Sequence, residues 1–298
     1  MSTAALTLVL VAAVVHPTWN LLARRATDGD PIAFVWLTSV LSAALYVPIV
    51  ITLSVTTPTR LHDVRVGLAM MAGTGILHVI YFVLLQRSYR VSEFSLVYPL
   101  ARGTGPLVTA LAAVTLFGER LAPLQFAGIA IIVLAIFVIA GGHANYSSAP
   151  AATRSLRRSL GYGIMTGLAI ASYTLWDKQA VSVLAISPIL YDFGRTVSQT
   201  LLLAPTVLRS NEKRNVLWRT WSRFRREALG VAILSPLAYV LILYALTAAP
   251  ASLVAPLRES SIVIGAFMGA HVLKEGQLLR RIVAASLMLA GIVALARG

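Results

Sequence analysis

The sequence predicts an all-α integral membrane protein with ten transmembrane helices in two inverted five-helix repeats around a central cavity. Three observations lead to this fold class. The 298 residues are 58% hydrophobic and 12% charged, with a mean hydropathy of +0.80, which lies outside the usual composition of soluble domains. Ten mainly apolar runs approach the length of about 20 residues that a bilayer-spanning helix needs. The second half of the chain also repeats the first.

The ten runs account for most of the chain. The first is interpreted as a span and not as a cleaved signal, because no basic segment precedes it and Arg24 and Arg25 follow it. The longest stretches between runs, of about 19 residues, are too short for a soluble domain. The runs begin near residues 3, 31, 66, 93, 121, 161, 188, 228, 251 and 278.

Several spans carry a proline in their interior, among them Pro17 in the first, Pro99 in the fourth and Pro256 in the ninth. An internal proline leaves the carbonyl four residues earlier without its helical partner and bends the helix. Backbone freed in this way at membrane depth usually faces a cavity. Simple shaping of the helix is the alternative interpretation.

Spans 5 and 10 carry small residues at seven-residue spacing. Gly128 and Ala135 recur in this way on span 5, and Ala284 and Gly291 do so on span 10. Small residues let neighbouring membrane helices approach closely. The pattern predicts close packing of both spans, within the chain or in a dimer.

An internal repeat divides the chain. An offset of 157 residues places Trp19 on Trp176 and aligns the segment 95–100 with 252–257, and a slip of one residue then places Glu119 on Glu275. An odd number of spans in each repeat makes the two halves enter the membrane in opposite directions, as in many alternating-access carriers. We therefore expect a first repeat over 1–141, a linker over 142–160 that forms a flexible joint, and a second repeat over 161–298.

The basic residues predict the orientation. The net charge of +14 comes from Lys and Arg in short loops and not from one solvated face, so it does not indicate nucleic-acid binding. Loops 1, 3, 5, 7 and 9 hold 17 of the 25 basic residues, which places the odd-numbered loops in the cytoplasm and both termini outside a plasma (inner) membrane. Loop 7, over 209–227, is either an interfacial helix on an anionic leaflet or a plain basic loop.

Five charged side chains stand well inside the spans: Arg102, Asp192, Arg195, Arg258 and Glu259. Each costs about 2.5 to 3.5 kcal/mol at mid-bilayer, so we expect them to be paired or to line a wet cavity. Asp192 and Arg195 are three residues apart on one helical face, which favours a local structural pair over a substrate contact.

Arg102 and Glu259 occupy equivalent positions in the two halves. If the pseudo-two-fold axis passes between their spans, the two side chains face each other. We hypothesise that they bridge the halves and that a solute or a proton competes for the bridge. A static buried ion pair is the alternative.

Aromatic and imidazole side chains are the other candidates for substrate contacts. Trp19 and Trp176 are matched by the repeat and lie near the ends of their spans, where an aromatic-belt anchor is the alternative interpretation. His78 and Tyr81 on span 3, with Tyr98 on span 4, predict a polar and aromatic wall for an organic substrate. A histidine bonded between helices is the simpler interpretation of His78. Both tryptophans have a polar neighbour, Asn20 and Asp177, which favours more than a belt anchor, and Lys178 after Asp177 is interpreted as marking the membrane interface.

The sequence gives no positive sign of catalysis. It contains no HExxH motif, no P-loop, no glycine-rich dinucleotide turn and no cysteine. We therefore expect no enzyme activity, no catalytic residue, no cofactor and no bound metal.

The two copies of one segment carry a family resemblance. Residues 95–129, SLVYPLARGTGPLVTALAAVTLFGERLAPLQFAGI, and residues 252–291 resemble the end of an EamA-type repeat of the drug/metabolite transporter superfamily, and 16–20, HPTWN, resembles the first span of one subgroup. The resemblance implies a ten-span basket whose cavity is lined mainly by spans 1, 3, 4, 6, 8 and 9. It also implies that Glu119 and Glu275 close the turn into the next span, and that metabolites are exported or exchanged.

The charged residues at the centre, Arg102, Arg258 and Glu259, are not expected in a binding site for a purely hydrophobic drug. They indicate that the substrate is a zwitterion or an anion, such as an amino acid. Arg102 and Arg258 would attract its carboxylate or phosphate, and Glu259 would pair an amine or carry a coupling proton. The expected partners are this solute and the lipid bilayer, for a monomer or a homodimer. A lipid flippase, a membrane-embedded enzyme and a non-transporting sensor are the alternatives.

Overall fold

The computed structural model describes residues 2–26, 29–56, 63–91, 94–140, 150–264 and 278–297, and this part of the chain contains helices and no strand. The elements in chain order are α1 (Thr3–Arg25), α2 (Pro31–Thr56), α3 (Val64–Val91), α4 (Phe94–Phe117), α5 (Pro123–Ala140), α6 (Pro150–Lys178), a π-helix η1 (Gln179–Val183), α7 (Pro188–Leu208), α8 (Asn211–Ala248), α9 (Ala251–Arg258) and α11 (Leu278–Arg297). These helices match the ten predicted spans, with α11 as the tenth.

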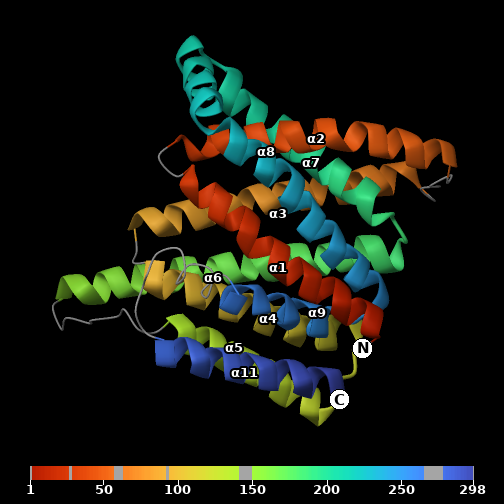
Figure 1. Ribbon diagram of the computed structural model, residues 1–298, viewed down its shortest axis with the longest axis vertical. Coiled ribbons are helices and arrows are strands. Elements are labelled where there is room, and N and C mark those ends of the chain that lie inside the picture. Colours follow the sequence, from red (N-terminus) through yellow and green to blue (C-terminus); the bar gives the residue numbers. More distant parts are fainter. Residues whose placement is uncertain are drawn as a thin grey trace.

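The packing of the helices follows the internal repeat. Helix α1 packs on α8 and α6 packs on α3, while α2 packs on α8 and α7 on α3. In the repeat, α1, α2 and α3 are equivalent to α6, α7 and α8. The contact of α1 with α8 is therefore equivalent to that of α6 with α3, and the contact of α2 with α8 to that of α7 with α3. Equivalent helices also pack on each other, and two such contacts, α5 with α11 and α2 with α7, lie at opposite ends of the view in Figure 1. The predicted arrangement of two inverted five-helix repeats is confirmed.

Small residues bring α5 and α11 together within one chain. A Cβ atom added to Gly128 would lie 2.9 Å from the carbonyl oxygen of Gly291, and one added to Gly291 would lie 2.9 Å from that of Gly128. Ala135 and Ala284 are fully buried. The predicted packing role of these four residues is therefore confirmed inside the bundle.

The two spans whose prolines are matched by the repeat, α4 with Pro99 and α9 with Pro256, differ in their backbone. Helix α4 continues through Pro99 to Phe117, whereas α9 ends at Arg258, shortly after Pro256. Glu259 occupies a turn before the helical residues 260–264, and its amide donates to the carbonyl of Pro256 at 3.1 Å. The predicted proline effect is thus a break on span 9 and not on span 4.

Two segments expected between spans are helical. Helix α6 begins at Pro150, so the expected linker over 142–160 is helical in its second part, and 141–149 lie outside the described residues. Loop 7 is also helical, because α8 begins at Asn211 and passes a kink at Phe224, where φ is −121° and ψ is 24°. Of the two interpretations of loop 7, the helix is the one that the structure contains.

The polarity of the bundle suits a lipid environment. Among the described residues, four helical segments are long and apolar enough to cross a membrane: Thr3–Ala23, Pro31–Thr56, Val64–Leu84 and Asn211–Ala248. Large apolar side chains such as Val55, Leu116 and Leu201 are exposed on the outside, while the charged side chains of Asp177, Asp192, Arg258 and Glu259 are buried. The interior is therefore where polar chemistry concentrates.

Candidate functional site

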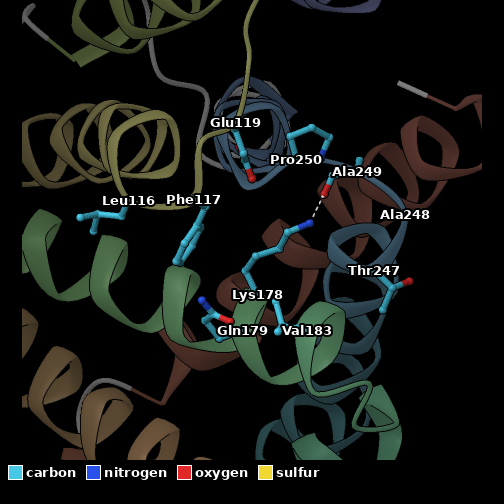
Figure 2. A pocket seen from close by; sticks show the side chains of 10 residues that line it. All are labelled: Leu116, Phe117, Glu119, Lys178, Gln179, Val183, Thr247, Ala248, Ala249 and Pro250. Atoms are coloured by element: carbon cyan, nitrogen blue, oxygen red, sulfur yellow. Dashed lines mark hydrogen bonds between the residues drawn. The ribbon is translucent and has the colours of Figure 1, made fainter.

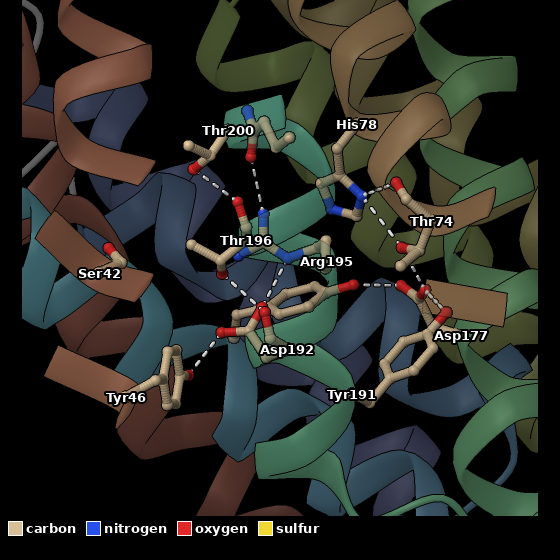
Figure 3. Close-up of polar contacts among 12 residues, drawn as sticks. Ser42, Tyr46, Thr74, His78, Asp177, Tyr191, Asp192, Arg195, Thr196 and Thr200 are labelled. Atoms are coloured by element: carbon tan, nitrogen blue, oxygen red, sulfur yellow. Dashed lines mark hydrogen bonds and ion pairs between the residues drawn. The ribbon is translucent and has the colours of Figure 1, made fainter. Parts of the chain in front are cut away.

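A buried polar cluster lies between the two halves of the protein. Its charged members are almost inaccessible, with exposed fractions of 1% for Asp177, 0% for Asp192 and 0% for Glu259. We call this group the central cluster, and Figure 3 shows most of it. Its residues are Tyr46, Thr74, His78, Tyr173, Asp177, Tyr191, Asp192, Arg195, Gln199, Tyr239, Arg258 and Glu259.

One ion pair in the cluster joins two residues of α7. Arg195 donates from Nε to Asp192 Oδ1 at 2.5 Å, as the spacing of the two residues predicts. Tyr46 on α2 donates to the other carboxylate oxygen at 2.5 Å, and Arg195 Nη1 donates to Gln199 at 3.1 Å. Because α2 and α7 belong to different halves, the hydrogen bond from Tyr46 links the halves, in addition to the ion pair that Asp192 forms with Arg195 on its own helix.

A second carboxylate, that of Asp177, joins four helices. It accepts hydrogen bonds from Thr74 on α3 and Tyr191 on α7, each at 2.8 Å, and a short one from Tyr239 on α8. Asp177 itself lies on α6 and is 1% exposed. The carboxylate therefore lies in the bundle interior, because its face of α6 turns toward the neighbouring helices.

Aromatic rings surround His78 in the cluster. Its ring lies 4.3 Å from that of Tyr173 on α6 and 5.4 Å from that of Tyr239, measured between centroids. Tyr81 lies 5.8 Å from the same Tyr173 ring. His78 and Tyr81 therefore face a common aromatic wall, whereas the side chain of Tyr98 on α4 lies outside the described residues.

Arg258 and Glu259 lie where α9 ends. Arg258 Nη2 is 3.4 Å from Glu259 Oε1, and its guanidinium carbon is 5.8 Å from the centroid of the Tyr173 ring. Arg102 lies on α4, which packs against α9, but its side chain falls outside the described residues. The proposed bridge between Arg102 and Glu259 therefore stays a prediction.

The two matched tryptophans lie outside the central cluster. Trp176 is 38% exposed and donates from Nε1 to the carbonyl of Met70 at 2.9 Å, and its ring covers Gly73, where an added Cβ would lie 2.5 Å from Cζ2. Trp19 packs edge-on against His16, at 4.9 Å between centroids, and against the group formed with Phe224. Each tryptophan thus packs on the opposite half, one on α3 and the other beside α8.

A cavity of about 610 Å³ opens where the C-terminal ends of α4, α6 and α8 meet, at the face of the even-numbered loops (Figure 2). Lys178 donates to the carbonyls of Leu246 and Ala249 at 2.8 Å each, close to the turn between α8 and α9. The cavity is lined by Leu116, Phe117, Glu119, Lys178, Gln179, Val183, Thr247, Ala248, Ala249 and Pro250.

Glu119 caps a helix of the other half. Its carboxylate accepts from the amides of Ala251 at 2.9 Å and Ser252 at 3.1 Å, and from the Ser252 hydroxyl at 2.5 Å. These amides belong to the first turn of α9, where a negative charge is favourable. The structural role implied for Glu119 holds, but it caps α9 instead of closing the turn into α5. Glu275 lies outside the described residues.

Sequence reasoning missed most of the uncharged members of the cluster. Spans 2 and 7, which the resemblance did not place around the cavity, contribute Tyr46 and Tyr191. One signal was available, since a tyrosine hydroxyl within an apolar span needs a hydrogen-bond partner. The pattern of tyrosines does not say which carboxylate each one meets.

The comparisons with known proteins agree with this architecture. The profile of the EamA-like transporter family matches residues 3–141 and 158–297. No curated protein matches the chain. A solved crystal structure superposes with a TM-score of 0.74 over 99% of both chains, at 14% sequence identity, which shows a shared fold.

Proposed function

The chain belongs to the EamA-like transporter family, a family of membrane transporters and not of enzymes, and from this premise we propose that it carries a small zwitterionic or anionic metabolite, such as an amino acid. Transport would proceed by alternating access as the two halves rock about the central cluster, in export or exchange. In inverted-repeat carriers the substrate site lies near the midplane, at the interface of the repeats.

The central cluster is the observation that supports this proposal. Buried charges are expensive in a membrane protein and usually mark a pathway for a solute or an ion. Here they lie between the halves, among the rings of Tyr173, Tyr239 and His78. Guanidinium groups suit a carboxylate or phosphate, carboxylates suit an amine, and rings suit the apolar part of a solute.

We assign different roles to Arg195 and Arg258, the two arginines of the central cluster. Arg195 already has Asp192 at 2.5 Å, so its main role is structural. Arg258 is 3.4 Å from Glu259 and faces the Tyr173 ring, and we propose that it binds the anionic group of the solute together with Arg102. Glu259 would bind the amine. Trp19, Trp176, Tyr81 and Tyr98 remain candidates for contacts with the apolar part as the halves move.

A ligand screen on the purified protein tests the proposed function. Amino acids, organic acids and phosphates are added separately, and the thermal unfolding of the protein is measured with each. A true substrate at about 100 times its dissociation constant should add about 2.7 kcal/mol to the free energy of unfolding. Arg258→Gln should abolish this gain, whereas Arg120→Gln, an exposed arginine at the even-loop face, should retain it.

Transport itself is tested by counterflow in proteoliposomes with the radiolabelled form of the stabilising solute. The wild type should exchange label and Arg258→Gln should not. Stabilisation by phospholipids alone, with no solute effect and no exchange, would contradict the carrier function and favour a flippase. Binding without exchange would favour a sensor.

A further inference from the structure

A short chain of hydrogen bonds links the imidazole of His78 to the carboxylate of Asp177. Thr74 Oγ1 donates to Asp177 Oδ1 at 2.8 Å. His78 Nδ1 lies 2.9 Å from the Thr74 carbonyl oxygen and 3.2 Å from Thr74 Oγ1 (Figure 3). A carbonyl oxygen only accepts, and Thr74 Oγ1 already gives its hydrogen to Asp177, so Nδ1 carries a hydrogen. In the neutral ring, Nε2 is then the basic nitrogen.

The surroundings of Asp177 suit its ionised form. Three hydroxyl groups, those of Thr74, Tyr191 and Tyr239, donate to the two carboxylate oxygens. The three hydroxyls occupy three of the four or so lone-pair sites of the carboxylate, and a proton bound at the fourth site would remove the negative charge that strengthens all three hydrogen bonds. Protonation therefore weakens the ties that this single carboxylate makes.

Those ties cross the boundary between the halves. Thr74 is on α3 of the first repeat, whereas Asp177, Tyr191 and Tyr239 are on α6, α7 and α8 of the second. Helix α3 packs on both α6 and α7. A change of charge at Asp177 thus acts on the interface that has to rearrange when two halves alternate.

Other charged and titratable groups lie around the hydrogen bonds that link His78, Thr74 and Asp177. The Arg195 guanidinium lies 4.9 Å from the centroid of the Tyr239 ring, and Lys178 turns away toward the end of α8. Around Asp177 and His78 these groups are Tyr173 on α6, Tyr191, Asp192 and Arg195 on α7, Tyr239 on α8, and Arg258 and Glu259 at the end of α9.

We propose that the His78–Thr74–Asp177 chain is the proton-binding site of this carrier, with Asp177 as the group whose protonation loosens α3 from α6. A hydronium ion gives its proton to a carboxylate oxygen of Asp177 and leaves as water. The Thr74 hydroxyl then donates to a neutral acid in place of a carboxylate, so this hydrogen bond between the halves becomes weaker. This inference rests on the proposed transport function and names its coupling ion and site.

Infrared difference spectroscopy of the protein in lipid nanodiscs tests the site without any solute. Lowering the pH from about 8 to about 5, a range in which buried carboxyl groups can take up a proton, should produce the carbonyl stretch of a protonated buried carboxyl group. The band should be absent in Asp177→Asn and present in Glu119→Gln, which alters a carboxylate outside the chain. A band that persists in Asp177→Asn, or no band in the wild type, would overturn the proposal.

Thr74 provides a second test that leaves both titratable groups in place. Thr74→Val removes one donor to the carboxylate, which favours its protonated form, so the band should persist to higher pH than in the wild type. Thr74→Ser keeps the hydroxyl and should restore the wild-type profile. If the carboxyl band had the same pH dependence in all three proteins, the proposed hydrogen-bond chain would be contradicted. Thermal unfolding of each variant shows whether it is folded.

Proteoliposomes separate the failure of coupling from the failure of transport. With a radiolabelled amino-acid mixture as the probe, Glu119→Gln should retain both counterflow and the accumulation driven by a pH gradient, whereas Asp177→Asn should lose that accumulation. Wild-type accumulation in this variant would overturn the coupling site and leave the carrier function intact. A wild type that moves no label in either assay would contradict the proposed amino-acid transport, whereas the infrared result would still decide the proton site.

Discussion

At the residue scale, hydroxyl groups decide how a carboxylate is accommodated inside this membrane protein. Asp192 has an arginine partner, but Asp177 is held by three hydroxyls, and no side chain within salt-bridge distance is found for it in the described part of the chain. Hydrogen bonds to charged groups are worth roughly twice as much as neutral ones, so such a shell compensates part of the cost of burial. Each hydroxyl should therefore contribute measurably to stability.

Tyr239→Phe tests this contribution. The substitution removes the hydrogen bond to Asp177 and keeps the ring that faces Arg195 and His78. We expect a loss of about 1 to 3 kcal/mol in the free energy of unfolding, because a buried carboxylate loses a donor. Tyr244→Phe, on the same helix at a position 39% exposed, serves as the control and should change stability by less than about 0.5 kcal/mol. Equal effects of the two substitutions would contradict the role of the hydroxyl.

At the element scale, the two repeats use the same helices in unequal ways. Helix α4 is continuous, whereas α9 ends after eight residues and places Glu259 in the break. Glu119 stabilises the start of α9 from the other half, and Lys178 lies on the last carbonyls of α8. The turn between α8 and α9 is thus held by opposite charges that complement the ends of the two helices. This fixes the short helix that carries Arg258.

The packing of α5 on α11 gives a prediction with a matched control. Gly128→Ala would place its Cβ 2.9 Å from the backbone oxygen of Gly291, which cannot move aside as a flexible side chain can. We expect a loss of about 1 to 3 kcal/mol from overpacking, measured by thermal unfolding in detergent. Gly161→Ala has no neighbour within 4 Å and should be neutral or stabilising by up to about 1 kcal/mol. A neutral Gly128→Ala would show that the two helices separate easily.

At the scale of the whole molecule, the repeat creates an interface between halves that is polar in its middle. Asp177, Asp192 and Glu119 each bond to a residue of the opposite repeat, at 2.8 Å to Thr74, 2.5 Å to Tyr46 and 2.9 Å to Ala251. Polar bonds of this kind can be exchanged for other partners, including a solute or a proton, more readily than a packed apolar core can be rearranged. The arrangement suits two halves that move against each other.

The orientation of the molecule remains a prediction that labelling can check. The absence of cysteine allows single cysteines to be introduced into an otherwise unreactive chain. With a maleimide that does not cross membranes, Ser222→Cys in the basic segment should be protected in intact cells, because the odd-numbered loops are predicted to be cytoplasmic. Thr247→Cys at the even-loop face should be labelled, and both should react after permeabilisation. The reverse pattern would show that the basic residues do not set the orientation.

The sequence by itself determined the class of the protein, its ten spans, its division into two inverted halves and the pair of Asp192 with Arg195. These features depend on hydropathy, on the internal repeat and on residues within one helical turn. Each can therefore be read from a short stretch of sequence or from the comparison of the two halves. The equivalence of Trp19 and Trp176 was visible in the same way, although their packing partners were not.

Only the tertiary structure decided which residues meet in the centre. The partners of Asp177 are separated from it by 103, 14 and 62 residues, and a span that is apolar all round gives no sign of the face it turns inward. Helix α5, with no resolvable amphipathic direction, is such a span. The rotation of each helix follows from packing against several neighbours at once, which is why the sequence did not place Asp177 in the core of the bundle, where it lies.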